Sequence, residues 1–125
     1  MRRGFGCRKW TVLTSQSLLS ALILSVLAKK SLHGYSLLDE LKEMGIDTSL
    51  IHHTVIYRLL RFMEVNGLVK SEWETGGTGP ARRIYMITEL GIEYLKDWYM
   101  KVKDDLNIME KIMKNIEESI LKGGE

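Results

Sequence analysis

The sequence predicts a mainly α-helical protein with one small β-hairpin, and two observations lead to this fold class. Apolar residues recur at three- and four-residue intervals along several long segments, which is typical of helices that bury one face. Between residues 68 and 88 this pattern gives way to two short segments of β-branched, aromatic and alternating residues. The order of these patterns predicts three helices, a two-stranded hairpin and a long final helix.

The composition indicates one ordinary globular domain. The chain has 125 residues, of which 45% are hydrophobic and 27% are charged. The longest apolar run, residues 18–27, is too short to cross a bilayer, and no signal peptide is expected. Cys7 is the only cysteine, which excludes an internal disulfide and suits a reducing cytoplasm. We therefore expect a cytoplasmic protein that does not enter the membrane.

Each expected helix has recognisable limits. The first runs from residue 14 or 15 to 28 and is apolar nearly all round, so it should be buried. The second covers residues 34–44 and stops at Gly45, and the third covers residues 52–66 and ends at the pair Asn66 and Gly67. The last helix is expected over residues 89–121. Its apolar stripe contains Leu95, Trp98, Val102, Leu106, Met109, Met113, Ile116 and Ile120.

The hairpin should consist of residues 68–74 and 82–88. The segment TGGTGPA between them contains three glycines and the only proline, a composition typical of a hairpin tip. We expect Val69, Trp73, Ile84 and Met86 to face the core, because a three-helix unit this small needs the hairpin to close it. Three helices followed by a hairpin is the order of a winged helix-turn-helix.

The third helix has one polar stripe. On a helical wheel, Thr54, Tyr57, Arg58 and Arg61 lie opposite the apolar residues Ile56, Leu59, Leu60 and Met63. In a helix-turn-helix the second helix of the pair enters the major groove of DNA. Hydroxyl, phenol and guanidinium groups can bind phosphates and base edges there. The predicted DNA-binding residues of this helix are therefore His52, His53, Thr54, Tyr57, Arg58 and Arg61. The alternative is an ordinary amphipathic helix with a solvated face and a polar start.

Two further basic elements could reach DNA. Lys70, Arg82 and Arg83 flank the glycine-rich tip of the wing, although they could also be simple exposed strand charges. The N-terminal segment could enter a minor groove as a basic arm or remain a solubilising tail. Its cations are Arg2, Arg3, Arg8 and Lys9. We thus divide the chain into an arm (1–13), a winged-helix DNA-binding domain (14–88), a dimerisation helix (89–121) and a tail (122–125).

The net charge of +2 hides an asymmetry between the two parts of the chain. Residues 1–88 contain 12 Lys/Arg and 7 Asp/Glu, a net charge of +5, whereas residues 89–125 contain 6 and 9, a net charge of −3. This distribution favours a part that faces a polyanion and a second part with another task.

The chain resembles the PadR-type transcriptional regulators over roughly residues 17–120. The resemblance rests on HGYSLLDEL, IYRLLRFMEVNGLVKSEWE and RRIYMITELGIEYL. It implies a winged-helix homodimer that binds DNA and usually represses transcription, with Tyr57 at the position that commonly contacts the DNA backbone. The single helix at the end is similar to the short-tailed branch, some of whose members hold flat aromatic drugs between paired tryptophans. In this chain Trp98 lies one helical turn earlier than those tryptophans, and Val102 occupies the position that matches them. This difference argues against drug binding between paired tryptophans.

The last helix is expected to pair two chains. Some thirty helical residues span about 45 Å, more than a domain of this size can cover. A second copy is the economical partner, and two recognition helices would then match a palindromic operator. We expect the interface to contain Leu95, Trp98, Val102, Leu106 and Met109, with the first helix of the partner. Any pocket for a small aromatic effector should lie at the same place, with Trp98 as its wall, unless Trp98 only fills the dimer core.

Other function classes have less support. A winged helix can serve as a protein-interaction scaffold without binding DNA, but its polar stripe would more often mix charge signs, and residues 54–61 contain no acid. No phosphate-binding glycine loop, metal-ligand spacing or nucleophile–base pair is evident, so we expect no enzyme, no cofactor and no metal.

Overall fold

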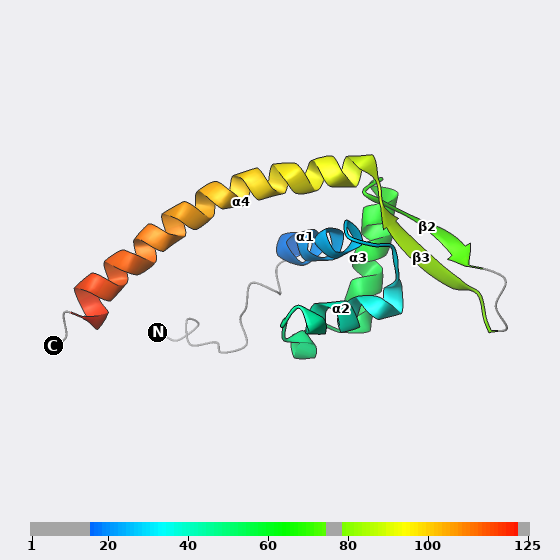
Figure 1. The fold of residues 1–125 in the computed structure, drawn as a ribbon, viewed down its shortest axis with the longest axis horizontal. Helices are drawn as coiled ribbons and strands as arrows, with labels where there is room; N and C mark the ends of the chain where they lie inside the picture. The colour runs from blue at the N-terminus through cyan, green and yellow to red at the C-terminus, as the bar shows by residue number, and fades with distance from the viewer. Residues whose placement is uncertain (1–15, 75–78, 123–125) are drawn as a thin grey trace.

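The computed structural model describes residues 16–74 and 79–122, which form a winged helix-turn-helix followed by a long helix (Figure 1). This confirms the predicted fold class. The elements in chain order are α1 (Gln16–Leu27), β1 (Leu32–His33), the 3₁₀ turn η3 (Gly34–Ser36), α2 (Leu37–Glu43), the 3₁₀ turn η4 (Thr48–Leu50), α3 (His53–Val65), β2 (Val69–Glu74), β3 (Arg82–Ile87), α4 (Glu89–Ile116) and the π-helical turn η5 (Glu117–Leu121). The predicted start of the first helix at residue 14 or 15, the basic arm and residues 123–125 lie outside the described residues.

The sheet has one strand more than the sequence predicted. β1 pairs antiparallel with β3, and β2 pairs with the other side of β3, which gives the order β1-β3-β2. The predicted second helix also divides, because residues 34–36 form the turn η3 before α2 begins. The chain thus passes from the sheet into the helix-turn-helix within a few residues, and the wing strands contact η3 and α3.

The core lies between α1, α2, α3 and one face of the sheet. α1 is buried along most of its length, as predicted, and Ile23 and Leu24 are fully enclosed. α2 contributes Leu37 and Leu41, and α3 contributes its apolar stripe. This packing leaves the opposite side of α3 facing solvent.

The expected core face of the hairpin was partly wrong. Val69 is buried and packs opposite Ile87, but the buried residue in the middle of β3 is Tyr85. Ile84 and Met86 point to the other face because successive side chains alternate along a strand. Trp73 lies on the core face but beyond the end of the core, so its side chain is 59% exposed.

The junction between α3 and α4 is tightly fixed. Gly67 adopts a φ of +79° directly after α3, a conformation that favours glycine. The Thr88 hydroxyl donates to the Gly67 carbonyl at 2.6 Å and accepts from the Gly91 amide at 3.0 Å, which caps α4. Gly91 packs so closely on the Leu68 carbonyl that a side chain would not fit. These contacts set the direction in which α4 leaves the domain.

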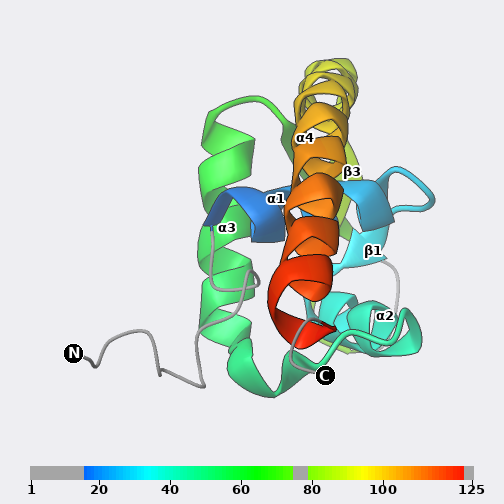
Figure 2. The same ribbon diagram turned by 90° about the vertical axis from the view of Figure 1, so that its left-hand side faces the viewer.

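α4 runs over α1 and then extends past it as a curved helix (Figures 1 and 2). Its 28 residues correspond to about 42 Å. Figure 1 shows that the C-terminal half of α4 has no other described element of this chain beside it.

Candidate nucleic-acid interface and the groove between α1 and α4

α3 places its predicted polar stripe on the outside of the domain. Ile56, Leu59, Leu60 and Met63 are buried, while the residues of the opposite stripe are exposed, namely Thr54, Tyr57, Arg58 and Arg61. Within residues 16–74 and 79–122, the side chains of Arg58 and Arg61 have no hydrogen-bond or ion-pair partner. The helix therefore presents two uncompensated guanidinium groups to solvent.

The start of α3 is polar and open. His52 is the N-cap residue in an extended conformation, and its side chain makes no capping hydrogen bond. His53 and Thr54 follow in the first turn, and all three side chains are exposed. Exposed amides at a helix start favour an anion such as phosphate. The geometry is therefore compatible with the predicted role of His52 and His53.

The connection that precedes α3 contains the turn η4, which the sequence had not predicted. The Asp47 carboxylate accepts a hydrogen bond from the Ser49 amide at 3.0 Å and so caps this turn. Hydrogen bonds from Ser49 lower the pKa of Asp47 below its ordinary value. Ile51 is buried and anchors the end of the connection.

The wing cations differ in their surroundings. Lys70 is exposed, and no partner for it is found in the part of the chain that the structure describes. The Arg83 guanidinium lies 5.0 Å from the Trp73 ring centre and 3.8 Å from a Glu64 carboxylate oxygen. Because Glu64 also accepts from the Ser71 hydroxyl, Arg83 belongs to a small network that ties the wing to α3. The tip itself, residues 75–78, lies outside the described residues.

Arg82 is joined to a residue that the sequence analysis did not select. Its guanidinium donates to the Tyr35 phenol oxygen at 2.9 Å and lies 5.4 Å from the centre of that ring. Tyr35 belongs to η3, 47 residues earlier in the chain. Nothing in the local sequence pattern indicates this pairing, because it depends on β1 joining the sheet.

Tyr57 faces the same region from α3. Its ring packs on Gly34, where an added Cβ would lie only 2.5 Å from Tyr57 Cε1. Burial, and secondarily the nearby phenols of Tyr85 and Tyr35, raises the pKa of Tyr57 above its ordinary value. Tyr57 therefore stays protonated near neutral pH and can donate a hydrogen bond.

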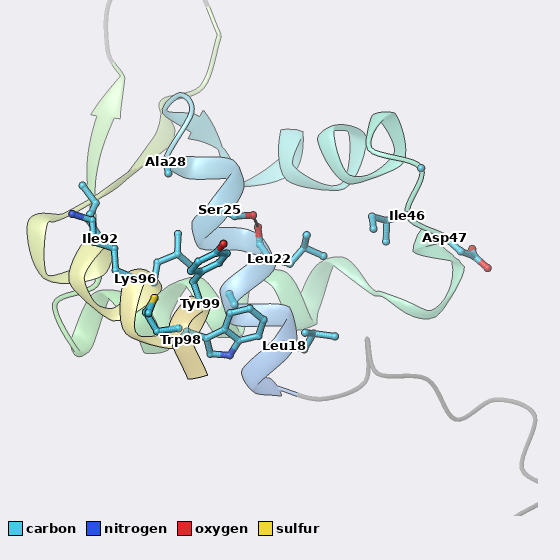
Figure 3. Close-up of a pocket in the computed structure, with 14 residues that line it drawn as sticks. Leu18, Leu22, Ser25, Ala28, Ile46, Asp47, Ile92, Lys96, Trp98 and Tyr99 are labelled. Carbon is cyan, nitrogen blue, oxygen red and sulfur yellow. Dashed lines mark hydrogen bonds between the residues drawn. The ribbon is translucent and has the colours of Figure 1, made fainter. Parts of the chain in front are cut away.

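A large apolar groove lies between α1 and α4 (Figure 3). Its volume is about 1080 Å³, and the connection after α2 closes one end through Ile46 and Asp47. Most of its lining side chains come from the two helices, among them Leu18, Leu22, Ser25, Ile92, Leu95, Trp98 and Tyr99. The Trp98 indole donates to the Ser17 hydroxyl at 3.3 Å, which places the ring along the groove.

The five predicted interface residues fall into two groups. Leu95, Trp98 and Val102 are half-buried, and the first two line the groove against α1 of the same chain. Leu106 and Met109 lie farther along α4 and are more than half exposed. They begin a stripe of exposed apolar side chains that continues through Met113, Ile116 and Ile120.

No helix among the described residues is long and apolar enough to cross a membrane. Metal-ligating side chains also form no cluster in residues 16–74 and 79–122 that could hold an ion.

A winged helix with a basic, exposed recognition helix is the architecture of a DNA-binding transcriptional regulator. The family model of the PadR-like transcriptional regulators matches residues 23–97, and the chain belongs to this family. The family consists of regulators rather than enzymes, and its members bind DNA. The resemblance stated from the sequence is thereby confirmed.

Solved structures agree with this assignment. A conserved protein of unknown function, named as a potential transcriptional factor, is 33% identical with a TM-score of 0.71, covering 96% of this chain and 99% of that one. A PadR family transcriptional regulator from Eggerthella lenta is 30% identical with a TM-score of 0.70, covering 82% and 88%. A Streptococcus transcriptional regulator is 28% identical with a TM-score of 0.69, covering 83% and 99%. No curated protein matches the chain significantly.

Proposed function

We propose that this protein represses transcription as a homodimer that binds a palindromic DNA operator through α3. The observation that carries the proposal is the exposed stripe of α3, where Arg58 and Arg61 have no partner among the described residues. Guanidinium groups bind guanine edges in pairs and also bind phosphates, whereas Thr54 and Tyr57 offer hydroxyl donors. His52 and His53 would add contacts at the helix start, and Lys70, Arg82 and Arg83 would follow the backbone from the wing.

In the dimer we propose, α4 of the second copy packs across the open side of the groove. The stripe from Val102 to Ile120 alternates spacings of four and three residues, the pattern by which helices pack along a shared seam. The groove offers an apolar surface of matching character between α1 and α4. If α4 of each copy packs against the groove of the other, the apolar stripe and the groove are covered in both copies, as two-fold symmetry allows.

Binding to DNA is tested by the salt dependence of the dissociation constant. Fluorescence anisotropy with a labelled duplex of mixed sequence should give a Kd that rises steeply with salt, because each contacted phosphate releases condensed counterions. The expected slope of log Kd against log salt is roughly 0.9 for each contacted phosphate. A flat response would contradict the proposal and favour a protein-interaction scaffold.

The scaffold alternative has a specific weakness. Its partner would be a protein surface, for which the exposed stripe of α3 would more often carry both charge signs. The described part of this stripe carries cations and hydroxyl groups only, from Thr54 to Arg61. A polyanionic partner fits that chemistry better.

We also propose that a small planar aromatic effector binds in the groove, where Trp98 offers a flat ring near Tyr99 (Figure 3) and Met100 belongs to the lining. Such a molecule regulates DNA binding only if it prefers one arrangement of the two protomers. Acridine should quench the fluorescence of the wild type and of Trp73→Phe, but should quench Trp98→Phe much less. Equal quenching of all three proteins would leave Trp98 a packing residue.

A further inference from the structure

Arg82 and Glu74 face each other at the tip end of the two wing strands without forming an ion pair. They are direct partners in the register of β2 and β3, where opposite charges normally attract. The Glu74 carboxylate instead accepts a hydrogen bond from the His33 ring at 2.9 Å. The Arg82 guanidinium turns to the Tyr35 phenol oxygen, and no carboxylate among the described residues pairs with it. The positive charge of Arg82 therefore remains available to an outside anion.

Tyr35 is held in place by two neighbouring side chains. The His33 ring stacks on the Tyr35 ring with 5.2 Å between centres and an angle of 18° between planes. Arg82 lies against the same ring and donates to its oxygen, so the phenol proton of Tyr35 can point outward. The side chain is nevertheless 44% exposed. A donor already ordered in this way loses little conformational entropy when it binds.

Tyr57 brings a second phenol to the same place from α3. Its ring contacts Gly34, the residue that precedes Tyr35, and it is also partly exposed. The packing of Tyr57 thus aligns the edge of the recognition helix with the turn η3. The two phenol groups and the guanidinium thus come from η3 and from the two elements, α3 and β3, that pack against it.

We propose that Tyr35, Tyr57 and Arg82 form a phosphate seat, which binds one phosphate or two adjacent phosphates of the DNA backbone. The inference rests on the proposed function. Phenol O–H groups and a guanidinium are all donors, and hydrogen bonds to an ionised group are the strong ones. His33 acts as a positioning residue, because it holds the Glu74 carboxylate away from Arg82.

Neutral phosphates locate the seat on the DNA. A duplex that binds the full-length protein is first selected from a random pool. It is then synthesised as a series in which each member carries one uncharged methylphosphonate at a different backbone position. For the wild type, one or two positions per half-site should weaken binding about tenfold beyond the rest. The double variant Tyr35→Phe, Arg82→Gln should bind the unmodified duplex more weakly than the wild type does. A methylphosphonate at those same positions should lower the affinity of this variant less than twofold further.

The controls separate the seat from general electrostatics. The pair Tyr94→Phe, Lys101→Gln also removes one phenol hydroxyl and one positive charge, but from exposed residues of α4, and should behave as the wild type. If each methylphosphonate lowers the affinity of the Tyr35→Phe, Arg82→Gln variant as much as that of the wild type, the phosphate seat is refuted and the proposed function is left intact. A wild type that binds no duplex would overturn both.

The role of His33 is tested by rescue. His33→Phe preserves an aromatic ring beside Tyr35 but frees Glu74 to pair with Arg82, so DNA affinity should fall about fivefold to tenfold. Adding Glu74→Gln removes the competing carboxylate and should restore most of that affinity. A merely structural role for His33 predicts no recovery in the double variant, and that outcome would overturn the positioning role.

Discussion

Replacing Arg58 and Arg61 together with alanine should weaken DNA binding by at least about 100-fold and leave the melting temperature nearly unchanged. Each guanidinium that binds a base edge or a phosphate contributes roughly 1–3 kcal/mol, and two protomers lose two such groups each. Both side chains are exposed and have no partner in residues 16–74 or 79–122, so folding does not depend on them. Gel shifts and thermal unfolding measure the two effects.

A variant with the same change in net charge serves as the control. Lys101→Ala with Lys111→Ala removes the same charge from exposed positions of α4 and should change affinity only a few-fold. Equal losses in the two variants would show that only the overall charge matters. Unfolding of the arginine variant would instead make these residues structural.

Replacing Leu106 with glutamate should dissociate the dimer. In the proposed arrangement the new carboxylate is buried without a partner in both copies, which costs about 3–5 kcal/mol for each broken site. In the isolated chain the Leu106 side chain is 53% exposed, so the fold of one protomer should survive. Sedimentation equilibrium measures the shift from dimer to monomer, and circular dichroism verifies the helix content.

The neighbouring position supplies the control for this change. Asn107→Glu introduces the same charge one residue along α4, off the apolar stripe, and should remain dimeric. A Leu106→Glu protein that stays a dimer would refute the proposed interface. Loss of dimers in both variants would point to helix charge rather than to burial.

Strong periodicity explains which parts of the fold could be predicted from the sequence. In α3 the apolar residues Ile56, Leu60 and Met63 alternate with polar ones at helical spacing, so the buried face and the exposed stripe were both predictable. The limits of α3 also followed from local features, because Gly67 adopts the left-handed conformation that ends a helix.

The hairpin shows where such patterns fail. Ile84, Tyr85, Met86 and Ile87 are four consecutive apolar residues, so a period of two fits either face of β3 equally well. The strand β1 contains only two residues and forms through its pairing with β3, which no local pattern announces. The Tyr35–Arg82 contact depends on that pairing, and this is why Tyr35 could not be selected from the sequence.

α4 could be predicted as a helix, but its surroundings could not be. The apolar stripe indicated a partner, whereas the groove against α1 depends on the exit direction set by Thr88 and Gly91. The same stripe contains residues that pack within the chain, such as Leu95, and residues that do not, such as Met109. The spacing of residues is identical in both cases, so only the fold separates them.

In the proposed complex, two copies of this chain present two α3 helices to one face of duplex DNA. Selection of bound duplexes from a random-sequence pool by the full-length protein tests this arrangement most directly. We expect enrichment of an inverted repeat whose half-sites lie about one helical turn apart, roughly 10 base pairs from centre to centre. Enrichment of no sequence, or of single half-sites without a second copy, would contradict it.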